Sequence, residues 1–281
     1  MHESKDRSLF VAADGHGLLG LWEELNKDWR GAIENYPHVR FSGFEFYPWA
    51  FQGLIQNAGG SLDRQVMQAR RNGVLLAAIH MRTGGVHDVY GWFNRSKLFL
   101  LNEAMLPTIQ AMREIGCTVE YGVLHAPEAR NGGLMQCFMD DPRLLPYMLI
   151  ENHGHVGSDG TALSVARDLH DLKVPAGVMF DLMHSYQCTH YLDTDATRRI
   201  DMLLKNLKWV LESAVVGDIT TVGLHVPMGT DLSDALPYGI RKQILKEIVA
   251  MVNDPRYKPM VKFVTIEGQR NLPDALVLCH S

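Results

Sequence analysis

The sequence contains few cysteines, and no two of them lie close together. The four are Cys117, Cys137, Cys188 and Cys279, and no CxxC pair occurs among the 281 residues. Scattered cysteines of this kind argue against a disulfide framework and for reduced thiols. We therefore expect a cytoplasmic protein.

Long apolar runs and an excess of positive charge are also missing. No stretch reaches the roughly 18 apolar residues that a membrane span requires, and the polar residues 1–7 show no signal-peptide pattern. The formal net charge of −5 disfavours a general nucleic-acid-binding surface. We expect neither a membrane nor a nucleic acid as partner, although a locally basic groove would be compatible with this charge.

Short apolar runs alternate with segments of helical spacing along the whole chain. The expected strands are 8–13, 39–47, 74–81 and 118–124, followed by four runs that end on Glu151, Asp181, His225 and Glu267. The expected helices are 18–29, 62–72, 98–115, 161–172, 197–215 and 240–252, and 197–215 shows the clearest i, i+3, i+4, i+7 pattern. Alternating strands and helices predict a parallel sheet, and eight such units predict a closed (β/α)8 TIM barrel.

The chain length fits one such barrel. A barrel of this type needs roughly 250 residues, so we expect a single domain over residues 1–281, with a short or missing last helix. The alternative is an open, doubly wound sheet. Against it, the turn after the first run, Asp14-Gly15-His16-Gly17, lacks the third glycine of a dinucleotide-binding fingerprint.

Four apolar runs are each followed by a residue that can bind a metal. Catalytic side chains of parallel barrels lie at the C-terminal ends of the strands, so Glu151, Asp181, His225 and Glu267 should meet at one mouth. Four buried ionisable groups without a counter-charge would be costly, and a divalent cation would neutralise them. Three carboxylates and an imidazole suit Mn²⁺, Mg²⁺ or Co²⁺, and the imidazole also admits Zn²⁺.

These segments also resemble a known superfamily. LIEN (149–152), FDLMH (180–184), GLH (223–225) and TIEG (265–268), with GFEF at 43–46, are similar to the xylose isomerase-like barrels. That superfamily includes sugar epimerases of the D-tagatose 3-epimerase type, inosose dehydratases, hydroxypyruvate isomerases and endonuclease IV. The resemblance runs from about the second strand to the end of the chain.

The resemblance implies a metal-dependent sugar isomerase or epimerase of carbohydrate metabolism. In that branch one divalent ion would be held by Glu151, Asp181, His225 and Glu267. Glu151 and Glu267 would also form the acid–base pair: one of them would remove a proton and the other would return it, through an enediolate of a small sugar or hydroxy-carbonyl substrate. His184 would contact a substrate oxygen or serve as a further ligand. By analogy, the resemblance suggests a homodimer.

The first alternative within the same superfamily is an endonuclease IV-like phosphodiesterase with several zinc ions. Its additional ligands resemble His80 and His125, besides His184; the milder interpretation of His80 and His125 is substrate binding. The pattern departs after His225, where residues 226–234 contain no histidine in place of the downstream Asp-x-His pair. The acidic net charge also fits poorly with gripping a DNA duplex.

A second alternative is a barrel that binds a ligand or partner without catalysis. The epimerase branch usually carries a basic residue soon after the seventh strand, whereas the first one here is Arg241. Two further residues are assigned to substrate binding. Glu45 is predicted to touch substrate or to support a ligand, with a salt bridge at the rim as the structural alternative, and Trp92 is predicted to cover a sugar ring from a loop.

Overall fold

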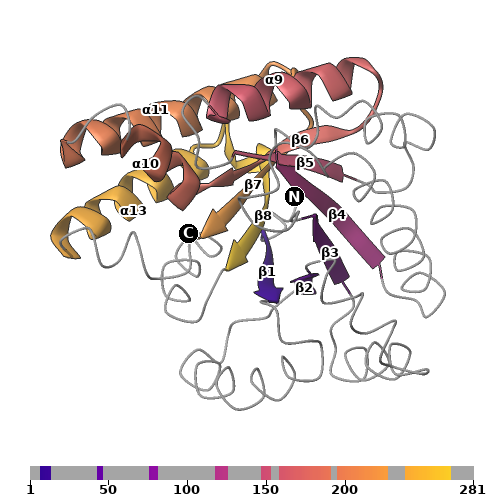
Figure 1. The fold of residues 1–281 in the computed structure, drawn as a ribbon, viewed down its shortest axis with the longest axis horizontal. Coiled ribbons are helices and arrows are strands. Elements are labelled where there is room, and N and C mark those ends of the chain that lie inside the picture. Colours follow the sequence, from indigo (N-terminus) through magenta and orange to yellow (C-terminus); the bar gives the residue numbers. More distant parts are fainter. Residues whose placement is uncertain are drawn as a thin grey trace, which may run out of the picture.

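Eight parallel strands close into a barrel (Figure 1). The computed structural model describes residues 7–13, 43–46, 76–81, 118–125, 147–152, 158–190, 195–226 and 238–266. The strands are β1 (Ser8–Ala13), β2 (Gly43–Phe46), β3 (Leu76–Met81), β4 (Thr118–His125), β5 (Tyr147–Glu151), β6 (Ala176–Asp181), β7 (Val222–Val226) and β8 (Val261–Ile266). Each strand pairs with its neighbour in sequence, and β8 pairs with β1. The predicted TIM barrel is confirmed.

The described helices cover the outside of the second half of the barrel. They are α9 (Ser158–Asp171), α10 (Leu182–His190), α11 (Ala196–Val215) and α13 (Tyr238–Asn253), with the short 3-10 helix η4 (Lys258–Met260) before β8. In Figure 1 the four α-helices lie together on the side of β5 to β8. None of the helices that the structure describes is long and apolar enough to cross a membrane.

Most predicted elements agree closely with these bounds. The predicted helices 161–172, 197–215 and 240–252 correspond to α9, α11 and α13. Strand β7 continues one residue beyond His225, and β8 begins two residues before the predicted start at Phe263. The predicted helices 18–29, 62–72 and 98–115, and the segment after β8, lie outside the described residues, as do parts of the single domain predicted over 1–281.

Helix α11 shows how local sequence sets an element. The side chain of Asp195 accepts hydrogen bonds from the backbone N–H groups of Thr197 (2.8 Å) and Arg198 (3.1 Å), which caps the first turn. Its apolar positions recur at helical spacing and are buried, and they include Leu203, Leu207, Val210, Leu211 and Ala214. After the C-cap Val216, Gly217 takes a φ of +85°, a left-handed conformation that glycine adopts without strain.

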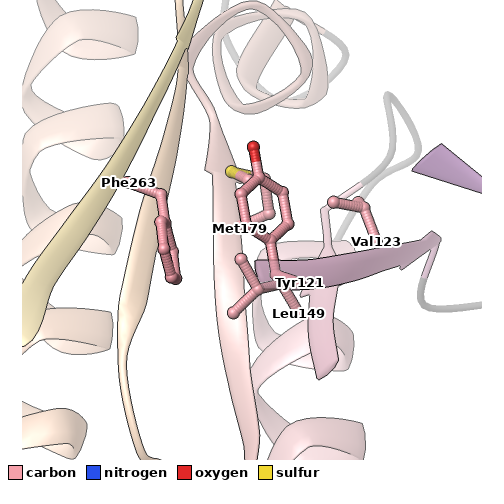
Figure 2. Close-up of a cluster of buried hydrophobic side chains, with 5 residues drawn as sticks. All are labelled: Tyr121, Val123, Leu149, Met179 and Phe263. Carbon is pink, nitrogen blue, oxygen red and sulfur yellow. The ribbon is translucent and has the colours of Figure 1, made fainter. Parts of the chain in front are cut away.

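The barrel interior is filled by side chains from alternate strand positions. One cluster consists of Tyr121, Val123, Leu149, Met179 and Phe263, all buried (Figure 2). Because side chains of a strand alternate between its two faces, Tyr121 and Val123 place His125 on the same inward face of β4. The apolar cluster therefore leads along the barrel axis to the polar groups at the strand ends.

Candidate metal centre

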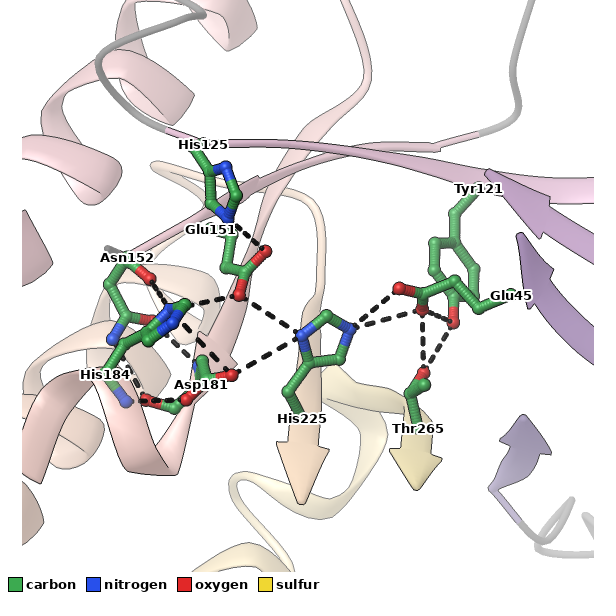
Figure 3. Close-up of polar contacts among 9 residues, drawn as sticks. All are labelled: Glu45, Tyr121, His125, Glu151, Asn152, Asp181, His184, His225 and Thr265. Carbon is green, nitrogen blue, oxygen red and sulfur yellow. Dashed lines mark hydrogen bonds and ion pairs between the residues drawn. The ribbon is translucent and has the colours of Figure 1, made fainter. Parts of the chain in front are cut away.

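Three strand ends bring Glu151, Asp181 and His225 together (Figure 3). The register pairs Asp181 directly with His225 across β6 and β7. Nδ1 of His225 lies 3.3 Å from Oε1 of Glu151 and 3.7 Å from Oδ2 of Asp181. One ligand atom from each residue lies within 4.8 Å of the others, and all three side chains are buried.

Asp181 is held by backbone contacts at the junction of β6 and α10. Its Oδ1 accepts a hydrogen bond of 2.6 Å from the backbone N–H of His184, in the first turn of α10. The side chain of Asn152 accepts from the Asp181 N–H (2.8 Å) and donates to the Asp181 carbonyl (3.0 Å). These contacts fix the carboxylate, and its buried Oδ2 receives no hydrogen bond within the described part of the chain.

A second group of possible ligands shares Glu151. Nε2 of His125 lies 3.2 Å from Oε2 of Glu151, and Nδ1 of His184 lies 3.3 Å from Oε1. Nδ1 of His184 also lies 2.9 Å from the carbonyl oxygen of Asn152. The ligand atoms of His125, Glu151 and His184 are again within 4.8 Å of one another. Glu151 therefore belongs to two possible ligand groups, one with His225 and the other with His125 and His184.

The carboxylates dominate the electrostatics of both nearby histidines. Burial of His225 disfavours its charged ring, but the surrounding carboxylates, chiefly Glu45 and Glu151, outweigh burial and raise its pKa well above 6.5. Burial also works against the charged form of His184, yet Asp181 and Glu151 raise its pKa to about 10. In the metal-free chain the positive charge of these rings offsets the buried carboxylates.

Glu45 enters the same network from β2. The carboxylate is fully buried, and its Oε1 lies 3.0 Å from Nε2 of His225. Its Oε2 accepts hydrogen bonds from the hydroxyls of Tyr121 (2.7 Å) and Thr265 (3.0 Å). The contact with His225 joins β2 to β7 across the barrel interior, and Figure 3 shows the ring of His225 between Glu45 and the pair Glu151–Asp181.

The structure brings together six of the predicted site residues: Glu45, His125, Glu151, Asp181, His184 and His225. His80 lies within β3, but its side chain is outside the described set. The predicted fourth ligand and second catalytic group, Glu267, follows β8 directly and is outside the described residues, as is Trp92. Their roles stay predictions.

Two residues of the network did not emerge from the sequence. Tyr121 and Thr265 hold Glu45 through their hydroxyls. Tyr121 precedes His125 on β4 by an even number of positions, and in the sequence Thr265 likewise precedes the predicted site residue Glu267. Because side chains of a strand alternate between its two faces, this spacing could have indicated from the sequence that Tyr121 and Thr265 belong to the site.

The residues present fit a divalent cation. Two carboxylates and one imidazole nitrogen are buried within a few ångströms of one another, and Oδ2 of Asp181 faces the group without a hydrogen-bond donor among the described residues. A cation between them would contact Oδ2 of Asp181 directly and take over the charge balance that the protonated rings of His184 and His225 provide in the metal-free chain. Oxygen-rich donor sets favour Mg²⁺ or Mn²⁺, and the imidazole is compatible with Co²⁺ or Zn²⁺.

Comparisons with known proteins find likeness in structure only. No family model and no curated protein matches the chain. A D-tagatose 3-epimerase-like protein matches with 14% identity and a TM-score of 0.46, over 96% of this chain and 93% of its own. The probable 3-DHS dehydratase AsbF of petrobactin synthesis from Bacillus anthracis matches with 10% identity and a TM-score of 0.47, over 96% of both chains.

A third solved structure comes from another enzyme class. A psychrophilic glycoside hydrolase family 10 endo-beta-1,4-xylanase matches with 10% identity and a TM-score of 0.48, over 94% of this chain and 86% of its own. Likeness at this level extends to proteins of different activities. This likeness therefore does not assign an activity to the chain.

Proposed function

We propose that this chain is a divalent-metal-dependent isomerase or epimerase of a small sugar or hydroxy-carbonyl compound. The proposal joins the resemblance in sequence to the xylose isomerase-like barrels with the geometry of the strand ends. The observation that carries it is the convergence of Glu151, Asp181 and His225 within 4.8 Å in a buried position. Glu267, next after β8, would complete the ligand set.

The reaction needs a group that removes a proton from carbon. A bound divalent ion would acidify the C–H between a carbonyl and a hydroxyl group of the substrate. Glu151 would accept that proton on Oε2, the oxygen that lies 3.2 Å from Nε2 of His125. Its Oε1 lies 3.3 Å from Nδ1 of His225, on the side where the metal would be bound. Glu267 would return a proton to the opposite face of the same carbon, so the substrate gains and loses one proton.

Two further histidines would bind substrate oxygens. His184 is partly exposed, at 20% of its side chain, and its Nδ1 lies 2.9 Å from the Asn152 carbonyl. That carbonyl accepts a hydrogen bond from Nδ1, so Nδ1 carries a proton and Nε2 is the nitrogen that would contact the substrate. His125, on the other side of Glu151, would help to hold the carbonyl or hydroxyl of the substrate. Both assignments follow the predicted substrate-binding roles.

Solvent exchange tests the proposed reaction. With Mn²⁺ present, the protein should incorporate deuterium from D₂O into at least one member of a panel of ketoses and aldoses. Glu151→Gln should abolish the incorporation, because an amide cannot accept the proton. Glu120→Gln makes the same chemical change on a half-buried strand position outside the site and should leave exchange intact. Unchanged exchange in Glu151→Gln would refute the acid–base role.

A second candidate is a metal-dependent phosphodiesterase related to endonuclease IV. The specific observation in its favour is the second ligand group of His125, Glu151 and His184, which shares Glu151 with the first. Paired metals held in this way can generate a hydroxide nucleophile. Two or three zinc ions per chain, together with cleavage of an abasic-site duplex that is lost in His125→Ala, would favour this candidate over the isomerase.

The third candidate is a barrel that binds a ligand without catalysis. Its support is the absence from the sequence of a basic residue soon after His225, where sugar epimerases usually carry one. Metal binding without any deuterium exchange or phosphodiester cleavage would favour it. A cytoplasmic, homodimeric protein remains part of the proposal, and chromatography with light scattering tests the dimer.

A further inference from the structure

The ring of His225 lies between two sets of carboxylates. Nδ1 faces Oε1 of Glu151 (3.3 Å) and Oδ2 of Asp181 (3.7 Å). Nε2 faces Oε1 and Oε2 of Glu45, at 3.0 Å and 3.2 Å. The side chains of His225 and Glu45 are both fully buried. An ion held between Glu151 and Asp181 therefore has access to Nδ1 and not to Nε2.

Glu45 is itself anchored to the apolar core. Its Oε2 accepts from the Tyr121 hydroxyl at 2.7 Å and from the Thr265 hydroxyl at 3.0 Å, and the two hydroxyls lie 2.7 Å apart. The ring of Tyr121 packs at a centroid distance of 4.6 Å against Phe263 in the core cluster. Strands β2, β4 and β8 thus fix a carboxylate beneath His225.

We propose that Glu45 is a positioning residue that presents Nδ1 of His225 to the metal. A neutral imidazole has one N–H and one lone pair, and the partner of one nitrogen decides which nitrogen can bind a metal. Glu45 has no proton to donate when ionised, so it selects the N–H at Nε2 and leaves the Nδ1 lone pair toward Glu151 and Asp181. This role is the ligand-supporting alternative predicted for Glu45, not the substrate contact, and it rests on the proposed metal site.

Replacing Glu45 should weaken metal binding without removing a ligand. In Glu45→Gln the amide can donate to Nε2, which stabilises the wrong tautomer. Loss of such a supporting carboxylate typically weakens metal binding about 10–100-fold. We expect a weakening of this size in calorimetric titrations with Zn²⁺. As a control, Thr221→Val removes the buried hydroxyl that donates to the Met260 carbonyl (2.9 Å), just before β7, and should leave Zn²⁺ affinity unchanged.

Nitrogen-15 NMR of the histidine rings reads the tautomer directly. In the wild-type protein with one equivalent of Zn²⁺, Nε2 of His225 should carry the proton and Nδ1 should show the shift of a zinc-bound nitrogen. This measurement needs no substitution, so it stands even where Glu45→Gln fails to fold. If Glu45 had only a structural role, Glu45→Gln would lower the melting temperature and leave both the Zn²⁺ affinity and the nitrogen shifts of the His225 ring unchanged.

The possible outcomes separate this inference from the proposed function. Wild-type Zn²⁺ affinity in Glu45→Gln, or a proton on Nδ1 of His225 in the zinc-loaded wild type, would overturn the positioning role and leave the metal site standing. Failure of the wild-type protein to bind Zn²⁺ would overturn both. Weakened binding in Glu45→Gln, with a protonated Nε2 in the wild type, would support both.

Discussion

Asp181 offers the sharpest test at a single atom. Asp181→Asn keeps the oxygen that accepts from the His184 N–H but removes the negative charge at Oδ2, which receives no hydrogen bond from described residues. We expect Mn²⁺ affinity to fall by more than about 100-fold, since removal of a ligand should exceed the roughly 10–100-fold typical of supporting groups. Equilibrium dialysis with Mn²⁺ measures the change.

The matched control for Asp181→Asn is Asp218→Asn. Asp218 forms an ion pair of 2.6 Å with Arg167, and the two side chains are partly exposed, Arg167 at 37% and Asp218 at 41%. Ion pairs in contact with solvent contribute at most about 1 kcal/mol to stability, so this substitution should leave the chain folded and Mn²⁺ binding unchanged. Equal affinities for the two variants would show that Asp181 is no ligand.

The raised pKa of His184 predicts how the metal-free protein responds to pH. Asp181 and Glu151 outweigh burial and lift this pKa from 6.5 to about 10. The protonated ring therefore stabilises the folded state fully below pH 6.5, and the stabilisation is lost as pH rises toward 10. Chelator-treated protein should show a melting temperature that falls across this range, and His184→Gln should flatten the fall. A wild-type melting temperature that rises over the range would contradict the assignment.

Among the elements, β6 depends on a glycine for its close contact with the chain before β7. A Cβ on Gly177 would lie 2.3 Å from the backbone carbonyl oxygen of Thr221, which cannot move aside as a flexible side chain can. Gly177→Ala should cost about 1–3 kcal/mol, the usual range for overpacking. Chemical denaturation measures the change in the free energy of unfolding.

Gly160 in α9 is the control for Gly177→Ala. A Cβ there would meet only the ring of Trp209, at 3.4 Å and 3.5 Å. Alanine is favoured over glycine inside a helix by about 0.5–1 kcal/mol, so Gly160→Ala should leave stability unchanged or raise it. If the two substitutions change the free energy of unfolding equally, the close contact at Gly177 does not require a glycine at this position.

Strands were predictable where apolar runs are short and bounded by polar residues. Strand β1 has the predicted bounds, and β5 and β6 end on the predicted Glu151 and Asp181. The predicted start of β8 was too late because Lys262 interrupts the apolar run in the sequence. In the structure, Nζ of Lys262 lies 4.3 Å from the centre of the Tyr147 ring. A long side chain of this kind can keep its charge near a polar or aromatic group while its stem packs on the barrel.

Helix α10 was not predicted. Its nine residues, Leu182–His190, follow Asp181 without an intervening loop and show only weak separation of apolar and polar faces. The Asp181 side chain binds the His184 N–H and so supports the first turn. A residue predicted as a metal ligand therefore also caps a helix, and sequence periodicity alone does not separate these two uses.

The candidate centre was predictable in part. Glu151, Asp181 and His225 end or nearly end successive strands, and a parallel barrel places such ends together. The contact between Glu45 and His225 joins residues 180 positions apart. It depends on barrel closure and on the lengths of both side chains, which no local pattern encodes.

At the scale of the molecule, the closed barrel makes the strand ends a single site. Pairing of β1 with β8 completes the ring, so residues from β2, β5, β6 and β7 converge on one interior. A metal at this point would link strands that are distant in sequence. Binding to the folded state alone should therefore stabilise the whole barrel.

Removal of the metal should lower the melting temperature. A ligand at 100 times its dissociation constant stabilises the folded state by about 2.7 kcal/mol. For a chain of this size, 1 kcal/mol corresponds to roughly 2–4 °C, so Mn²⁺ should raise the melting temperature by roughly 5–10 °C. Scanning calorimetry with and without Mn²⁺ measures the shift, and His225→Ala should show none.

The number of ions bound per chain tests the central claim most directly. After dialysis against Mn²⁺ and removal of free metal, elemental analysis should find about one ion per wild-type chain and none in His225→Ala. Wild-type protein without bound metal, or a His225→Ala variant that retains the full amount, would contradict a metal centre formed by Glu151, Asp181 and His225.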